Sequence, residues 1–411
     1  MKLATAAIGA ALTIAYFGAA EAAPNPEAVG LSRERLERID AMIERRIAAG
    51  DLTGAVAIVA RRGEVAHVTL HGVMDLESQK AMRADTMIRI ASMTKPIVGV
   101  GIMMLVEENK LRLTDPVARY IPEFRDLRVA VARTEGGSGP TPSFDLVPPQ
   151  RAVTIKDLLT HVSGLGSGPM SDSMIQPVAR REGETLADYI PRLGSTALEF
   201  QPGTRWTYSP GAGFETLGRV LEIVSGMPLD EFFERRIFAP LGMRDITFWP
   251  SDSQWPRVAT VYRREDVGLV KQTMPNDTFS RNVYFRGSGG LYSTAEGYVP
   301  FGIMLANGGE LGGVRLLSRK SVEMLKAVHV ADTLPGRPTG EGFGLSVRVV
   351  TDHAARGTLL SDGTYGWSGA QGTHFFVDPK EQLVGVLMIQ TPNVTEIRSD
   401  FENLVAQAII D

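Results

Sequence analysis

Cysteine is absent from all 411 residues of this chain. That absence excludes disulfide bonds, a cysteine nucleophile and cysteine-based zinc sites. An excess of basic charge is missing too, because 43 Lys and Arg residues face 47 Asp and Glu residues and leave a formal net charge of −4. No basic field is therefore available to hold nucleic acid. Histidine is limited to 6 residues and none forms an H-E-x-x-H sequence, so we expect no metal centre and no other cofactor.

Long apolar runs are missing from the chain except near its beginning. Residues 3–17 are rich in Ala, Ile and Leu, follow Lys2, and precede A-E-A at 20–22, which matches the A-x-A site of a secretory signal peptide. We therefore predict a signal peptide at residues 1–22, cleavage after Ala22, and export to the periplasm or the medium. No cysteine follows the site, so we expect neither a lipid anchor nor stable membrane association of the mature chain. The alternative is an uncleaved membrane helix, for which the segment is short.

Hydrophobic periodicity predicts helices and strands in a definite order. The composition is ordinary for a globular protein, with 44% hydrophobic and 22% charged residues. Apolar residues at three- and four-residue spacing predict a helix at residues 31–50, and β-rich runs at 54–60 and 64–70 predict a hairpin. Helical patterns fill the middle of the chain. The strands and closing helix predicted for the last third lie at 343–350, 372–377, 383–390 and 396–409.

Strands at both ends of the chain and helices between them indicate two lobes within one domain at residues 23–411. We predict an α/β protein of the α+β type. An antiparallel sheet flanked by helices is expected from about 30–88 and 287–411, and a mostly helical lobe from about 89–286.

Two segments have no periodic pattern. Residues 134–150 are rich in Gly, Pro and Ser and are predicted to form a surface loop. Residues 166–183 are predicted to be a second irregular segment, of the kind that serves as a lid or binding loop.

A serine and a lysine three residues apart carry the main chemical signal. Ser92 and Lys95 precede an apolar segment of helical length at 97–106, and residues three apart on a helix lie on one face, about 5–6 Å apart at Cβ. The hydroxyl and the amine can therefore meet near the positive end of the helix dipole. The chain uses 9 Lys against 34 Arg, yet this position holds lysine, which can lose its proton and act as a base. A helix N-cap followed by a solvated lysine explains the pair alone equally well.

Three other stretches offer the remaining parts of a serine-hydrolase site. Tyr208 can accept the serine proton if a nearby ammonium lowers its pKa from the usual value near 10. The Gly-rich stretch at 366–373 precedes a predicted strand and can offer backbone N–H groups to a carbonyl oxygen. His161 ends a predicted helix, where a structural hydrogen-bonding role is the more common one. The plainer alternatives are a packed tyrosine and an ordinary glycine turn next to a core tryptophan.

Several separated motifs, taken in order, resemble the penicillin-recognising serine hydrolases. This family includes the class C β-lactamases, the D-Ala-D-Ala carboxypeptidases and the family VIII carboxylesterases. The matching motifs are S-M-T-K at 92–95, L-L-T-H-V-S-G-L at 158–165, Y-S at 208–209 and G-W-S-G-A-Q-G-T at 366–373, with further similar stretches at 115–124, 201–209, 238–243 and 289–318. The resemblance covers nearly all of the chain after residue 22 and implies a β-lactamase/transpeptidase-like fold.

The resemblance also implies a role for each matching residue. Ser92 would be the acylated nucleophile, and Lys95 and Tyr208 would share the role of general base. The backbone N–H groups of Ser92 and Ala370 would form the oxyanion hole.

Two departures from the β-lactamase pattern concern specificity. Pro210 stands where the β-lactamases have an asparagine whose amide holds the lactam side chain. Trp367, Ser368 and Gly369, which are expected to contact substrate, stand where they have Lys-Thr-Gly, so the cation that would pair with a substrate carboxylate is missing. A tryptophan wall favours apolar, uncharged groups. Both departures resemble the family VIII esterases, and we predict a serine carboxylesterase for small-molecule esters with weak or no β-lactam turnover.

Other functions stay open at this stage. Within the family, the chain can be an amide or peptide hydrolase, such as a D-aminopeptidase, a D-Ala-D-Ala carboxypeptidase or a weak β-lactamase, or an acyltransferase. A catalytically inactive binder of cell-wall fragments is a further alternative. Residues 366–370 also approximate the G-x-S-x-G elbow of the α/β-hydrolases, but that mechanism needs an acid and then a histidine later in the chain. No histidine follows His374, so this last interpretation is excluded.

Overall fold

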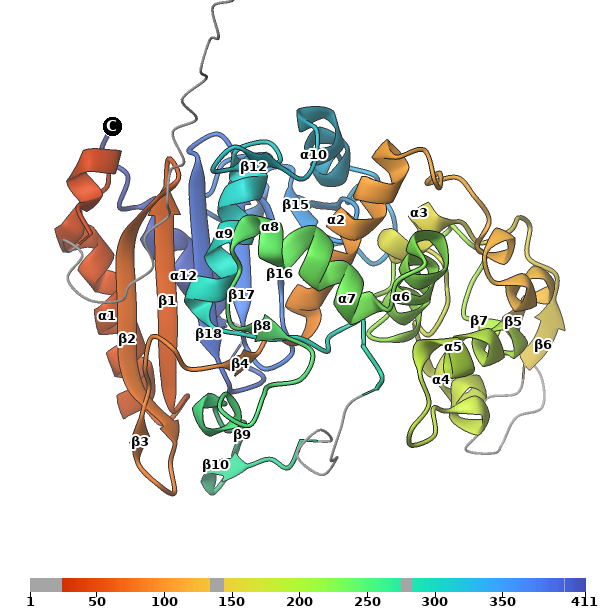
Figure 1. The fold of residues 1–411 in the computed structure, drawn as a ribbon, viewed down its shortest axis with the longest axis horizontal. Helices are drawn as coiled ribbons and strands as arrows, with labels where there is room; N and C mark the ends of the chain where they lie inside the picture. Colours follow the sequence, from red (N-terminus) through yellow and green to blue (C-terminus); the bar gives the residue numbers. More distant parts are fainter. Residues whose placement is uncertain (1–23, 134–143, 275–282, 395) are drawn as a thin grey trace, which may run out of the picture.

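In the described residues, one antiparallel sheet combines strands from both ends of the chain. The structure is a computed structural model that describes residues 24–133, 144–274, 283–394 and 396–411, so the predicted signal peptide lies outside the described residues. Eight strands pair in the spatial order β14-β15-β16-β17-β18-β1-β2-β3 (Figure 1). Their bounds are β1 Gly54–Arg61, β2 Glu64–Asp75, β3 Lys80–Ala81, β14 Glu341–Phe343, β15 Arg348–Val350, β16 Tyr365–Ser368, β17 His374–Asp378 and β18 Leu383–Ile389.

Strand β1 lies inside the sheet, between β2 and β18. It pairs along its length with both neighbours, and all of its residues are buried. A nearly continuous apolar run is typical of a strand that is covered on both faces. Arg62 and Gly63 take positive φ values of 55° and 84° in the turn to β2, which confirms the predicted hairpin.

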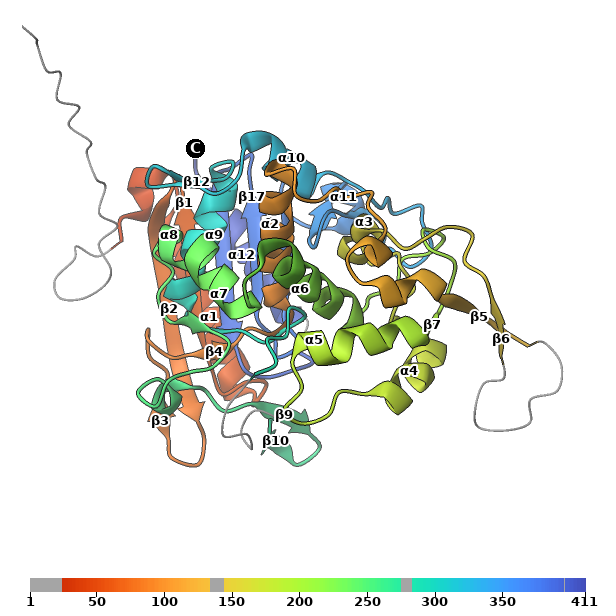
Figure 2. The same cartoon turned by 45° about the vertical axis from the view of Figure 1, so that its right-hand side comes forward.

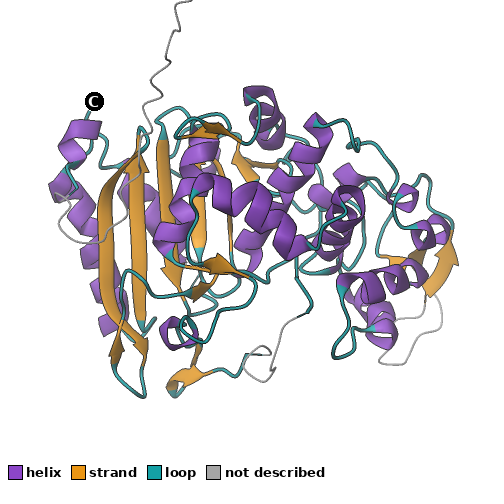
Figure 3. Ribbon diagram, viewed as in Figure 1, coloured by secondary structure: helices purple, strands orange, loops and turns teal. Residues whose placement is uncertain are grey.

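Helices cover both faces of the sheet (Figure 3). Alternate residues of β1 belong to different cores: Ala55, Ala57 and Val59 pack in one cluster, and their neighbours Val56 and Ile58 in the other. Helices α1 (Arg33–Ala48) and α12 (Glu396–Ala406) supply the first cluster, and α2 (Thr94–Glu107) and α9 (Ala295–Ala306) the second. The predicted antiparallel sheet flanked by helices is therefore confirmed.

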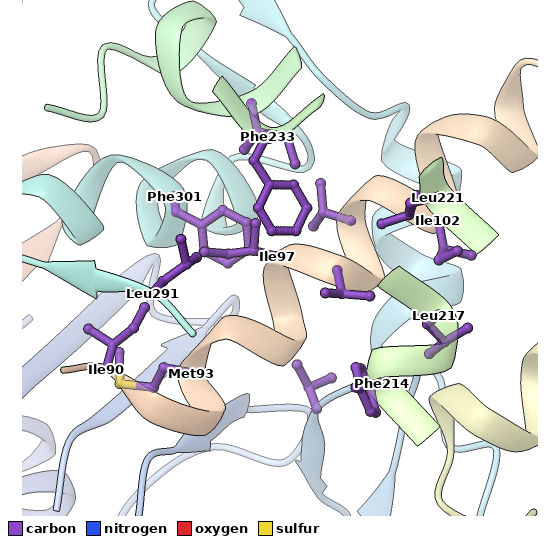
Figure 4. Packing of buried hydrophobic residues seen from close by; sticks show 14 of the residues in the cluster. Ile90, Met93, Ile97, Ile102, Phe214, Leu217, Leu221, Phe233, Leu291 and Phe301 are labelled. Carbon is purple, nitrogen blue, oxygen red and sulfur yellow. The ribbon is translucent and has the colours of Figure 1, made fainter. Parts of the chain in front are cut away.

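Helix α2 is the central element of the second core. Its residues from Thr94 to Leu105 are all buried, as expected for a helix that is apolar on every side. Figure 4 shows Ile97 of α2 beside Phe301 of α9 and Phe233 of α7 (Leu229–Phe233). Further along α2, Ile102 lies beside Leu217 and Leu221 of α6 (Ala212–Ser225). Helix α2 is thus held between the sheet and the helical part of the molecule.

Gly99 allows α2 to approach the turn between β14 and β15 closely. A Cβ atom at this position would lie 2.1 Å from Ser346 Oγ. Gly99→Ala is therefore expected to lower the free energy of unfolding by about 1–3 kcal/mol, measured by urea denaturation. Ser346→Gly removes the obstacle at a residue whose φ of 72° suits glycine, so the double variant should regain most of the loss. If the double variant instead loses the sum of the two single-variant losses in unfolding free energy, the contact between residues 99 and 346 is not the cause of the destabilisation.

The helical part of the molecule lies on the other side of α2 and extends away from the sheet (Figure 2). Helices α3 Ile155–Leu159, α4 Pro169–Ile175 and α5 Leu186–Tyr189 belong to this part. The other described helices lie nearer the sheet and are α8 Ala239–Leu241, α10 Arg319–Lys326 and α11 His353–Arg356. The small sheets are β6-β5-β7 (Phe144–Val147, Arg128–Ala132, Ala197–Leu198), β4-β11-β8 (Ile88–Arg89, Tyr292–Ser293, Ile246–Thr247), β10-β9 (Gly268–Lys271, Tyr262–Glu265) and β12-β13 (Glu310–Leu311, Val314–Arg315).

Both segments predicted to be irregular contain regular structure. Within 134–150, the structure describes strand β6, which pairs with β5, while residues 134–143 lie outside the described part. Within 166–183, Pro169 begins α4, and Ser171 fixes it: its amide donates to Glu199 Oε2 at 2.7 Å and its Oγ to Ala197 O at 2.8 Å. The prediction for 166–183 is therefore wrong at Pro169–Ile175, and the prediction for 134–150 is wrong at Phe144–Val147, because contacts with other parts of the chain stabilise both elements.

The strand predicted at 343–350 is also wrong, because this stretch forms two strands. Strands β14 and β15 pair with each other around a tight turn at 344–347. Gly344 and Ser346 permit the reversal, since Gly344 packs against the carbonyl of Leu325 and Ser346 adopts a left-handed conformation. The turn could not be predicted because the apolar pattern continues through it without interruption.

Candidate active site

Ser92 lies in a strained turn at the start of the buried helix α2. The 3₁₀ turn Ala91–Met93 leads directly into α2. Ala91 has a φ of 46°, which is uncommon for a residue with a Cβ atom, and the Gly289 backbone packs against it. Such strain concentrates at functional sites, where the surrounding structure maintains it. The turn presents the Ser92 hydroxyl at the N-terminal end of the helix, as the S-x-x-K spacing predicts.

Lys95 is fully buried between Ser92 and two backbone carbonyl groups. Its Nζ lies 3.1 Å from Ser92 Oγ, 2.9 Å from Pro210 O and 2.6 Å from Ser288 O. Burial lowers the pKa of the Lys95 ammonium, although Tyr208 acts in the opposite direction. The ammonium donates to all three oxygens, and loss of the proton that faces Ser92 leaves a lone pair directed at the serine while the two carbonyls keep the other N–H groups. This arrangement suits a base.

Tyr208 reaches the same serine oxygen from the helical part of the molecule. Its hydroxyl donates to Ser92 Oγ at 2.7 Å, and Lys95 Nζ lies 4.9 Å from the centre of its ring. The structure therefore brings Ser92, Lys95 and Tyr208 together, although Tyr208 lies 116 positions after Ser92 in the chain. The Lys95 amine and the Tyr208 hydroxyl are therefore both close enough to accept a proton from Ser92.

His161 supports the segment that carries Tyr208. Its Nδ1 accepts the backbone N–H of Ser209 at 3.1 Å, and its ring lies 4.7 Å from the Tyr208 ring between centres. Burial lowers the pKa of His161 well below its usual value, so the imidazole is neutral. These contacts agree with the structural role that the sequence favours for this histidine.

Trp367 and Ser368 form the end of strand β16, where the sequence indicates a glycine-rich turn before a strand. Strand β15 pairs with β16 only as far as Gly366, so the last two residues of β16 have no partner on that side among the described strands. The Trp367 ring lies 5.5 Å from the Tyr208 ring between centres. The structure therefore places Trp367 beside Tyr208.

The turn at 369–373, called the oxyanion turn below, is attached to the backbone beside Ser92. Thr373 Oγ1 donates to Ile90 O at 3.1 Å. A Cβ atom on Gly369 would lie 2.4 Å from the same carbonyl oxygen, so only glycine permits this approach. Ala370 is exposed, and its N–H has no acceptor in the ranges that the structure describes. Its amide is thus available to a ligand next to the serine.

Two residues that lie beside Lys95, namely Ser288 and Glu215, were not identified from the sequence. The Ser288 carbonyl accepts from Lys95 Nζ, and the Ser288 hydroxyl donates to Glu215 Oε1 at 2.8 Å. Glu215 lies in the first turn of α6 and is buried, with the Tyr284 hydroxyl at 2.5 Å and Arg286 Nε at 3.3 Å. An acidic residue on the buried, apolar stripe of a helix is unusual. The position of Glu215 on this stripe was the one feature of the sequence that could have indicated its role.

Other features of the described residues bear on cofactors and membranes. In these ranges, no group of three or more His, Cys, Asp and Glu side chains is placed to hold a metal ion. Nor does any described helix combine the length and the apolar character needed to cross a membrane.

Comparisons with known proteins identify the family of the chain. The Beta-lactamase family model matches residues 39–408. Esterase EstB from Burkholderia gladioli is 32% identical over 393 residues, covering 89% of this chain and 93% of EstB. Protein Rv1367c from Mycobacterium tuberculosis (strain ATCC 25618 / H37Rv) is 35% identical over 358 residues, covering 83% and 86%. The solved structure of EstCE1, described as a hydrolase with promiscuous acyltransferase activity, has a TM-score of 0.76 at 24% identity and covers 94% of this chain and 99% of its own. This chain belongs to the beta-lactamase family of serine hydrolases.

Proposed function

We propose that the protein hydrolyses uncharged carboxylic esters of small molecules through an acyl-enzyme on Ser92. One observation carries the proposal: the Ser92 hydroxyl contacts both a buried amine, at 3.1 Å, and a phenol, at 2.7 Å. A serine becomes a nucleophile when an adjacent base accepts its proton. The similarity to EstB, an esterase, supports the ester as the bond that is cleaved.

In the acylation step, Ser92 Oγ attacks the ester carbonyl carbon while its proton passes to the Lys95–Tyr208 pair. The negative charge that develops on the carbonyl oxygen is accepted by the backbone N–H groups of Ser92 and Ala370. The bond to the alkoxy oxygen then breaks, and the alcohol leaves with the proton held by the pair.

In the deacylation step, a water molecule replaces the alcohol and the same groups act again. The Lys95–Tyr208 pair accepts a proton from water as its oxygen attacks the acyl carbon. The bond to Ser92 Oγ breaks, the serine recovers its proton, and the carboxylic acid departs. The two carbonyls bonded to Lys95 hold its amine in place during both steps.

The contacts around the oxyanion turn favour a substrate without a carboxylate. Trp367 offers an aromatic surface and no cation. Burial lowers the pKa of His374 well below its usual value, so this histidine is neutral, and its Nε2–H faces the Glu402 carboxylate at 2.8 Å. Its Nδ1 therefore accepts from the Ser368 hydroxyl at 2.9 Å, and that proton is not available to an anionic group.

A second candidate function is acyl transfer, in which an alcohol takes the place of water at the acyl-enzyme. The description of EstCE1 as a hydrolase with acyltransferase activity favours this candidate. Hydrolysis of amides or peptides uses the same acyl-enzyme and is the further alternative.

We also propose export of the mature chain, on the basis of residues 1–22.

Brief mixing with p-nitrophenyl butyrate and, separately, with benzylpenicillin tests the proposed function. We expect rapid release of nitrophenol, a transient mass increase of one butyryl group on Ser92, and no lasting penicillin adduct by intact mass. A stable penicilloyl adduct with little ester turnover would instead identify a penicillin-binding peptidase. Addition of methanol distinguishes acyl transfer, because methyl butyrate would then form at the expense of butyric acid.

A further inference from the structure

Helix α12 holds the oxyanion turn from the side opposite Ser92. Arg398 of α12 donates from Nη2 to the carbonyl oxygen of Gly369 at 2.6 Å. No carboxylate pairs with this guanidinium among the described residues, and its Nε is buried without a partner there. Its hydrogen bond therefore ends on a backbone carbonyl, which is an unusual use of a half-buried cation.

That carbonyl belongs to the same peptide group as the Ala370 N–H. The C=O of one residue and the N–H of the next lie in one plane and, in a trans peptide, point in opposite directions. No cis peptide occurs among the described residues. The Gly369 oxygen accepts from Arg398 Nη2 and also from the backbone N–H of Gly372 at 3.1 Å. Arg398 and the turn itself thus fix this oxygen together, and the Ala370 N–H consequently points away from α12.

A second residue of α12 fixes the strand that precedes the turn. Glu402 lies one helical turn after Arg398 on the same face. It accepts from His374 Nε2 at 2.8 Å, and His374 Nδ1 lies 2.9 Å from Ser368 Oγ. Glu402 is itself almost fully buried and pairs with Arg356 at 3.2 Å. Two residues of one helix therefore hold Ser368 and Gly369, immediately before the oxyanion donor.

We propose that Arg398 is a positioning residue that orients and polarises the Gly369–Ala370 peptide group, so that the Ala370 N–H stabilises the oxyanion of the transition state. A charged donor on the carbonyl oxygen draws electron density from the amide and makes its N–H a stronger donor. Because the negative charge exists mainly in the transition state, the effect falls on kcat rather than on KM. The inference rests on the proposed function, in which Ala370 supplies one of the two oxyanion donors.

Arg398→Met tests the proposal, because methionine retains much of the aliphatic stem and removes the charged donor. We expect kcat for p-nitrophenyl butyrate to fall about 10- to 100-fold, since removal of a whole oxyanion donor costs about 10²–10³-fold, while KM stays within about twofold. Affinity for an alkyl trifluoromethyl ketone, which binds serine nucleophiles as a hemiketal anion, should fall by the same factor as kcat. Arg398→Lys, which restores a cation with different geometry, should give an intermediate kcat.

Arg46→Met is the matched control. Arg46 Nη2 also binds α12, through Asp400 at 2.8 Å, but its contacts are with acidic side chains and not with the oxyanion turn. This variant should lose stability and keep its kcat. An unchanged kcat in folded Arg398→Met, or an equal loss in Arg46→Met, would overturn the inference. If Arg398→Met does not fold, an unchanged kcat in Arg398→Lys has the same meaning. Failure of the proposed function is separately visible, because the unmodified enzyme would then form no butyryl adduct.

Discussion

Ser92→Ala is expected to lower kcat/KM for p-nitrophenyl butyrate by at least about 10⁴-fold. The hydroxyl of Ser92 is the oxygen that both the Lys95 amine and the Tyr208 hydroxyl contact, at 3.1 and 2.7 Å. Without it, no covalent intermediate can form, and only the oxyanion donors and substrate binding are left to accelerate attack by water. Stopped-flow release of nitrophenol gives the rate, and intact mass shows whether the butyryl adduct has disappeared.

The same experiment needs a control for nonspecific effects of losing a serine hydroxyl. Ser195→Ala removes an exposed hydroxyl that, among the described residues, donates a hydrogen bond to the Arg192 carbonyl alone, and it should retain full activity. The melting temperature of Ser92→Ala should stay close to that of the unmodified protein, because the lost hydroxyl is not part of the packed core. Retention of more than a tenth of the ester activity in Ser92→Ala would locate the nucleophile elsewhere.

Lys95→Met and Lys95→Arg are both expected to lower kcat/KM by about 10²–10⁴-fold, the range that a positioned general base supplies. Methionine removes the amine. Arginine keeps a positive charge but cannot lose its proton, and its larger planar head does not fit the positions that one Nζ atom occupies between Ser92 and two carbonyls. Near-normal activity in Lys95→Arg would show that Lys95 acts only as a cation beside Tyr208.

The pH profile gives an independent measurement of the same role. Burial lowers the pKa of Lys95 below its ordinary value of 10.5. Because the neutral amine is the active form of a base, kcat/KM should rise as pH increases through the lowered pKa and level off below pH 10.5. Lys95→Met should lose this rising limb, while Ser195→Ala should keep it. An identical limb in Lys95→Met would assign it to another group.

Local sequence signals were sufficient to predict the elements that carry Ser92 and Lys95. The S-x-x-K spacing and the apolar run behind it predict the turn and the buried helix α2. The motif order also led to Tyr208, because the resemblance links stretches that no local rule connects. Helical hydrogen bonds lie within a few residues of each other, so a short window of sequence contains most of the information.

Elements that depend on distant partners could not be predicted in the same way. Strand β16 is a strand because β17 pairs with it, although its Y-G-W-S sequence indicates a turn. In the sequence, Arg398 is an ordinary charged residue of a predicted helix. Its contact with Gly369 is visible only in the fold. Glu215 likewise gains its significance from Ser288, which follows 73 positions later. Such contacts are set by topology rather than by local preference.

The position of β1 between β2 and β18 has a consequence for the newly made chain. At a synthesis rate of about 5–20 residues per second, the β1–β2 hairpin waits roughly 15–65 s for the strand that covers its other edge, since Val59 pairs with Gly385. During that time the hairpin has an open edge that can pair with other chains. The oxyanion turn, which comes just before β17, is also not yet made. A growing chain therefore carries Ser92 and Lys95 long before the turn at 369–373 is present beside them.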